Sequence, residues 1–175
     1  MDRKLLIMLA AILIISCTQK DIKEVEQMGE LKLTSPAFEN NGKIPSRYTC
    51  QGQDINPELN IEGVPKNTKS LVLIMDDPDA PIGTWVHWVV WNILVTTKIK
   101  EDSVPLGSMQ GLNDFGKHDY GGPCPPSGTH RYFFKIYALD TTLDLDKNSK
   151  KEDVEKAIKE HIIAQTKLVG LYKKE

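Results

Sequence analysis

The chain has 175 residues, of which 40% are hydrophobic and 26% are charged, and its formal net charge is −2. This length suits one domain with a hydrophobic core and argues against two, and the composition is that of an ordinary globular protein. Lysine and arginine alternate with aspartate and glutamate and form no basic stripe, so we expect no nucleic-acid partner.

The first 30 residues predict export and a membrane anchor. Arg3-Lys4 precede an apolar stretch, 5–15, that is too short to span a bilayer but suits a signal-peptide core. Ile14-Ile15-Ser16-Cys17 resembles the lipobox of bacterial lipoproteins, in which cleavage precedes the cysteine and its sulfur then carries a diacylglycerol. A plain secretory signal or an uncut signal anchor is the alternative.

We therefore divide the chain into a signal peptide (1–16), a lipidated Cys17 with a polar tether (17–30), and one folded domain (31–175). The expected location is the cell envelope, on the extracytoplasmic side of a membrane that holds the lipid anchor. This is either the periplasm or the cell surface.

The domain begins with short apolar or alternating runs separated by Gly, Pro, Asn and Asp clusters, which is typical of antiparallel β structure. The expected strands are 31–34, 59–62, 70–76, 86–94 and 131–140. The runs 70–76 and 86–94 are apolar on both faces, so we place them inside a sheet that is covered on each side. The long irregular stretch 98–129 is expected to be functional or flexible.

A first proline-stiffened motif follows the 70–76 run. Asp77 and Asp79 flank Pro78, and in extended geometry their side chains point the same way and repel each other, a repulsion that His87 is placed to relieve. Because side chains alternate along a strand, we expect His87 to point away from both Val86 and Trp88.

A second proline-stiffened motif, Gly122-Pro123-Cys124-Pro125-Pro126, leads into His130-Arg131-Tyr132, where His130 and Tyr132 share one side of a strand. If the two motifs meet at one end of a sheet, they form a pocket of carboxylates, imidazoles and a phenol. Such a pocket suits a small polar head group, either an anionic or phosphate-bearing one held by the imidazoles and nearby backbone amides or a primary ammonium held by the acids.

The two remaining cysteines, Cys50 and Cys124, are an even pair in an exported chain, which favours a disulfide over two buried free thiols. After Leu145 the periodicity becomes helical. Ser149 with Glu152 forms a capping-box signature, and the pattern predicts one amphipathic helix that ends near Gly170, with His161 as a structural residue on its apolar face.

Taken in order, these motifs resemble the phosphatidylethanolamine-binding protein family (Raf kinase inhibitor protein-like), in its bacterial YbhB/YbcL branch, over roughly residues 31–172. The resemblance implies a mainly β fold, with two antiparallel sheets in a Greek-key β-sandwich and a C-terminal helix. It also implies one anion pocket lined by Asp77, Asp79, His87, Pro126, His130 and Tyr132.

We expect a binding protein and no enzyme, because neither Ser35 nor Ser127 lies in the Gly-x-Ser-x-Gly context of a nucleophile elbow. We also expect no cofactor and no metal. One alternative is a protein-interaction or inhibitor module that acts on an unidentified target enzyme. Another is a metal-dependent hydrolase, since two histidines with Asp77 or Asp79 make a two-His, one-carboxylate set, although no His-Glu-x-x-His spacing supports it. A third is that Asp77, Asp79 and His87 merely cap and brace turns.

Overall fold

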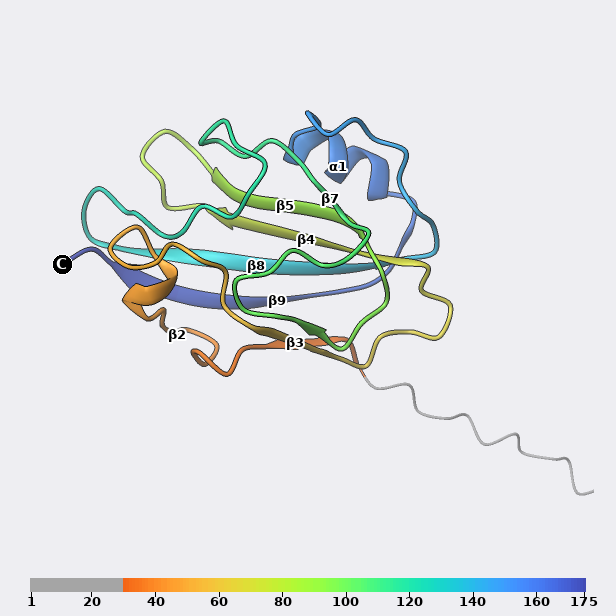
Figure 1. Cartoon of the computed structure of the whole chain (residues 1–175), viewed down its shortest axis with the longest axis horizontal. Coiled ribbons are helices and arrows are strands. Elements are labelled where there is room, and N and C mark those ends of the chain that lie inside the picture. The colour runs from red at the N-terminus through yellow and green to blue at the C-terminus, as the bar shows by residue number, and fades with distance from the viewer. Residues whose placement is uncertain (1–29) are drawn as a thin grey trace, which may run out of the picture.

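Two β-sheets account for most of the computed structural model, which describes residues 30–175 (Figure 1). The expected signal peptide, Cys17 and the tether up to residue 29 lie outside the described residues. Within 30–175, no helix is long and apolar enough to cross a membrane.

The larger sheet has six strands and the smaller has three. The larger sheet runs, in spatial order, β2 (Gly42–Lys43), β9 (Ile162–Lys173), β8 (Thr129–Leu139), β4 (Ser70–Asp77), β5 (Trp85–Ile93) and β7 (Met109–Gln110). The smaller sheet is β1 (Lys32–Thr34), β3 (Leu59–Glu62) and β6 (Lys98–Ile99). All pairs are antiparallel except β2 with β9. A short 3-10 helix spans Ser46–Tyr48.

The main hydrophobic core lies between the two sheets. Leu33, Leu59 and Ile61 of the smaller sheet pack in one cluster with Leu73 and Phe134 of the larger. All eight residues of β4 are buried, because β5 and β8 flank it and both of its faces are covered. The expectation of a mainly β, two-sheet fold with two buried central strands is confirmed, although the second of these strands is Trp85–Ile93 and Leu94 lies beyond its end.

A second core covers the other face of the larger sheet. Val154 and Ile158 of helix α1 (Lys151–Ile158) pack there with Val72, Ile74 and Trp91. The amide of Lys150 donates to Asp153 Oδ2 at 2.9 Å. The capping interaction at the start of α1 is thus made by Lys150 and Asp153, each one residue after the expected Ser149 and Glu152.

The predicted long helix is wrong beyond residue 158. Residues 162–173 form β9, which pairs with β8 from Leu139↔Ile162 to Thr129↔Lys173. The backbone hydrogen bonds of this pairing outweigh the weak helical periodicity of the segment. His161 therefore lies in the turn between α1 and β9, and its Nδ1 bonds Asp140 Oδ1 at 2.8 Å.

A buried carboxylate ties α1 to the sheet. Asp76 is 1% exposed and accepts hydrogen bonds from Lys135 Nζ at 2.7 Å and from Lys151 Nζ at 2.5 Å. Because successive side chains of a strand point to opposite faces, Asp76 lies on the helix side of β4 and Asp77 faces the other way. The Asp76 network thus fixes the end of the strand that carries Asp77.

Candidate functional site

A cavity of about 290 Å³ lies where β4 ends and where β5 and β8 begin. Its polar lining comes from both motifs found in the sequence: Asp77, His87, His130 and Tyr132. Its apolar lining is Ala80, Pro81, Ile82, Trp85, Phe115, Cys124, Pro125 and Pro126. The antiparallel pairing of β4 with both β5 and β8 brings these loops to one end of the sheet.

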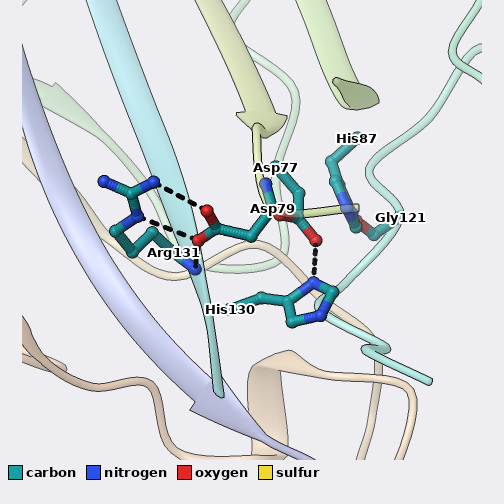
Figure 2. Close-up of polar contacts among 6 residues, drawn as sticks. All are labelled: Asp77, Asp79, His87, Gly121, His130 and Arg131. Atoms are coloured by element: carbon teal, nitrogen blue, oxygen red, sulfur yellow. Dashed lines mark hydrogen bonds and ion pairs between the residues drawn. The ribbon is translucent and has the colours of Figure 1, made fainter. Parts of the chain in front are cut away.

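Asp77 and His130 form a buried pair in this cavity (Figure 2). Asp77 Oδ2 accepts from His130 Nδ1 at 2.7 Å, and Oδ1 accepts from the amide of Asp79 at 2.8 Å. The carboxylate therefore holds the proton of His130 on Nδ1 and fixes the plane of the ring. Nε2 is then the ring nitrogen left for a ligand.

His87 reaches the cavity through a β-bulge. Trp88 pairs with Met75 and Val86 pairs with Asp76, so His87 has no partner across β4. Trp88 packs between the sheets, whereas Val86 packs beneath α1, so these two side chains lie on opposite faces of the sheet. The expectation that both point away from His87 is therefore wrong. An unpaired bulge residue breaks the simple alternation and re-aims its side chain.

The environment of His87 sets its tautomer and its charge. Nδ1 lies 2.6 Å from the carbonyl oxygen of Gly121, and since a carbonyl can only accept, Nδ1 carries the proton. Burial lowers the pKa of His87 below 6.5, and this outweighs the raising effects of the Gly121 hydrogen bond and of Asp77. At neutral pH the ring is uncharged, and Nε2 is an acceptor.

Tyr132 supplies a hydroxyl without a partner. Its side chain is 0% exposed and packs edge-on against His87, with ring centroids 5.2 Å apart. Among the described residues no partner meets its hydroxyl oxygen with hydrogen-bond geometry, although the Asp77 carboxylate and the Cys124 backbone lie close to it. Burial, together with the negative charge of Asp77, raises the pKa of Tyr132, so the phenol stays protonated. A buried hydroxyl without a partner is costly, and a ligand would satisfy it.

Asp79 is the one expected pocket residue that lies outside the cavity lining. Its Oδ2 accepts from the amide and from Nε of Arg131, both at 2.9 Å, and its Oδ1 accepts from Nη2 at 2.6 Å (Figure 2). Arg131 lowers the pKa of Asp79 to about 2. The repulsion expected between the two acids is thus relieved by Arg131 and His130, and Asp79 braces the loop after β4 against β8.

The wall opposite β4 is built from close backbone contacts. A side chain at Gly121 would clash with the Phe115 ring, and one at Gly122 would clash with Asp54 Oδ1, which accepts the Gly122 amide at 2.7 Å. The structure joins Cys50 to Cys124 by a disulfide, with their Cα atoms 5.5 Å apart. The disulfide holds the start of Cys124-Pro125-Pro126 beside the cavity.

Residues at the cavity mouth carry apolar surface that sequence reasoning did not assign to the site. Phe115 packs edge-on against Trp85 and His87, with ring centroids 5.5 and 5.4 Å apart. Ile82 is 82% exposed. Both are apolar residues within Pro/Gly-rich loops. That pattern identifies a site residue only when the exposure of the side chain in the folded protein is known.

The arrangement provides polar groups at the base of the cavity beneath an apolar mouth. Tyr132 donates, His87 accepts through Nε2, and His130 donates through Nε2 when its ring is doubly protonated. Within residues 30–175, no three His, Cys, Asp or Glu side chains are grouped so as to hold a metal ion.

A comparison with known sequences identifies a family that this chain matches. A family model described as phosphatidylethanolamine-binding protein matches residues 34–173. The UPF0098 protein of Methanothermobacter thermautotrophicus is 51% identical over 150 residues, which cover 82% of this chain and 99% of that protein. A UPF0098 protein of Pyrococcus horikoshii is 50% identical over 159 residues, which cover 86% of this chain and 80% of that protein.

Solved structures agree with this match. The phosphatidylethanolamine-binding protein homologue of Chlamydia trachomatis has a TM-score of 0.80 and 42% identity, covering 83% of this chain and 99% of that chain. YbcL of E. coli, described as a member of the mammalian phosphatidylethanolamine-binding protein family, has a TM-score of 0.79 and 33% identity, covering 84% of this chain and 100% of that chain.

Proposed function

Because the chain belongs to the phosphatidylethanolamine-binding protein family, we propose that it is a lipid-anchored, extracytoplasmic protein whose cavity binds a small anionic or phosphorylated head group without catalysis. The observation that carries the proposal is the buried Tyr132 hydroxyl, which has no hydrogen-bond partner among the described residues. It lines the same cavity as two histidines whose Nδ1 atoms are already hydrogen-bonded to the protein.

The polar groups match a singly protonated phosphate monoester. Two ligand oxygens accept from Tyr132 and from a doubly protonated His130, whose positive charge then lies between the anion and Asp77. The neutral His87 accepts the remaining P–OH proton through Nε2. The apolar mouth at Trp85 and Phe115 contacts the substituent that the phosphate carries.

The proposed location is supported by the amino-terminal sequence and by the disulfide. Residues 5–15 and the lipobox-like Ile14-Ile15-Ser16-Cys17 have the order and spacing of a lipoprotein signal. Disulfides persist in oxidising compartments, so the Cys50–Cys124 bond is compatible with a domain outside the cytoplasm.

The binding proposal is tested by thermal unfolding in the presence of O-phosphoethanolamine. A ligand present at 100 times its Kd stabilises the fold by about 2.7 kcal/mol, which raises the Tm of a domain of this size by roughly 5–10 °C. His87→Asn keeps a side-chain amide to donate to the Gly121 carbonyl but lacks Nε2, so we expect it to fold and to lose most of the shift.

His161→Ala is the matched control, because His161 also bonds a single acceptor, Asp140, but lies outside the cavity lining. We expect its ligand-induced shift to equal that of the wild type. No shift of the wild-type Tm at millimolar ligand, or an equal shift in His87→Asn, would contradict the proposal.

A further inference from the structure

A second group of exposed apolar side chains lies away from the binding cavity. Leu94, Val95, Val104 and Leu106 are 64%, 51%, 45% and 87% exposed. They line one hollow of about 360 Å³, which we call the 94–106 surface. Isolated exposed apolar residues are common, but four that share one hollow indicate an interaction surface.

The 94–106 surface and the binding cavity lie at opposite ends of β5. Trp85 starts the strand and lines the cavity, whereas Leu94 directly follows its last residue, Ile93. The 9 residues of β5 span about 30 Å at the usual rise of a strand. Gly107 lies beside Leu94, which brings the 103–106 segment back to the same end.

The amino-terminal end of the described chain emerges beside this surface. Lys32 at the start of β1 pairs with Glu62, and the neighbouring Ile61 amide donates to the carbonyl of Thr97 at 2.8 Å. Figure 1 shows the start of the described chain, coloured red-orange, at the end of the fold where β5 runs into the 94–97 turn, away from the loops around the cavity. Residue 30 is therefore close to the 94–106 surface.

The sequence between Cys17 and this point is short. Residues 18–29 reach at most about 40 Å even when fully extended. A lipid on Cys17 would therefore keep this end of the domain at the bilayer. Such tethering raises the local concentration so far that even a weak contact with lipid is populated.

We propose that the 94–106 surface rests on the lipid bilayer that holds Cys17, and that the binding cavity is turned away from that bilayer. The inference rests on the lipid anchor of the proposed function. Leu94 and Leu106 enter the acyl boundary. Of the two lysines in the lining, Lys98 pairs with Glu58 at 2.7 Å, and Lys100 suits contact with a lipid phosphate. The ligand then comes from the aqueous compartment and not from the anchoring membrane.

The test compares two tryptophan variants of the full lipidated chain in vesicles that contain acyl-chain-brominated phosphatidylcholine. Leu106→Trp places a quenchable reporter on the 94–106 surface. Ile82→Trp is its matched control, since Ile82 is 82% exposed, close to the 87% of Leu106, but lies at the cavity mouth. The wild-type signal of Trp85, Trp88 and Trp91 is subtracted.

We expect the added fluorescence of Leu106→Trp to be quenched at least twofold and that of Ile82→Trp to be unchanged. Quenching of Ile82→Trp alone would show the reverse orientation and would overturn the inference, as would no quenching of either reporter. Mass spectrometry of Cys17 separates the two claims. A lipidated chain without Leu106→Trp quenching refutes only the orientation, whereas an unmodified Cys17 refutes the anchor and the orientation with it.

Discussion

Replacing Asp77 by Asn removes the charge that orients His130 while preserving the size of the side chain. Asp77 accepts two hydrogen bonds, from His130 Nδ1 at 2.7 Å and from the Asp79 amide at 2.8 Å. The single amide oxygen of Asn replaces one of them, and its NH₂ group opposes the other donor. A hydrogen bond to a charged group contributes about 1.5–3 kcal/mol, and an unmatched buried donor adds to the loss.

We therefore expect Asp77→Asn to lower the free energy of unfolding by about 2–3 kcal/mol, which corresponds to a fall in Tm of roughly 4–12 °C. Because His130 also loses the carboxylate that orients its ring, affinity for O-phosphoethanolamine should fall at least tenfold. Urea unfolding measures the first effect, and titration calorimetry below the Tm of the variant measures the second.

Asp79→Asn is the matched control for Asp77→Asn. It makes the same chemical change two residues away, in a carboxylate that lies outside the cavity lining. Its stability should fall by about 1 kcal/mol, because its ion pair with Arg131 is partly exposed to solvent, and its ligand affinity should stay unchanged. Wild-type affinity in Asp77→Asn, or an equal loss of affinity in both variants, would refute the reasoning.

Three further predictions concern pH and the disulfide. Affinity for O-phosphoethanolamine should fall by up to about tenfold per pH unit between roughly pH 6 and 8, because the phosphate, whose second pKa is about 6, loses the P–OH proton that His87 accepts; calorimetry giving equal affinity at both ends would contradict this. The pKa of Asp79 is about 2 when folded against an ordinary 3.8, so its stabilisation is present above about pH 4 and is lost as pH falls towards 2. The stability difference between wild type and Asp79→Asn, followed by urea unfolding, should shrink over that interval, and a constant difference would count against the ion pair. The disulfide closes a loop with a sequence separation of 74, so its reduction should cost roughly 4 kcal/mol; thiol titration of the unfolded, unreduced chain should detect no thiol from Cys50 or Cys124, and two reactive thiols would exclude the bond.

Strands β1, β3, β4, β5 and β8 could be predicted because burial imposes a clear pattern on the sequence, whereas the two-residue strands β2, β6 and β7 are too short to carry one. The fully buried β4 appears as the apolar run 70–76, and β8 alternates from Thr129 to Leu139. The strand at 162–173 could not be predicted in this way. Its apolar spacing fits a helix as well as a strand, and only pairing with β8, a long-range contact, makes it a strand.

The candidate site could be predicted in outline but not in its charge assignments. Residue types identified Asp77, His87, His130 and Tyr132, and the structure brings all four to one cavity. The bulge at His87 depends on its register with β4. The pairing of Asp79 with Arg131, and not with a pocket histidine, depends on which side of the loop faces β8. Neither is a property of local sequence.

The central claim is that the cavity binds an anionic head group through its histidines and Tyr132. A crystal structure determined after soaking with O-phosphoethanolamine tests it most directly. We expect phosphate oxygens within hydrogen-bond distance of Nε2 of His87, Nε2 of His130 and the hydroxyl of Tyr132, with the rest of the ligand towards Trp85 and Phe115. An empty cavity at saturating ligand, or a ligand whose phosphate contacts none of these three atoms, would contradict it.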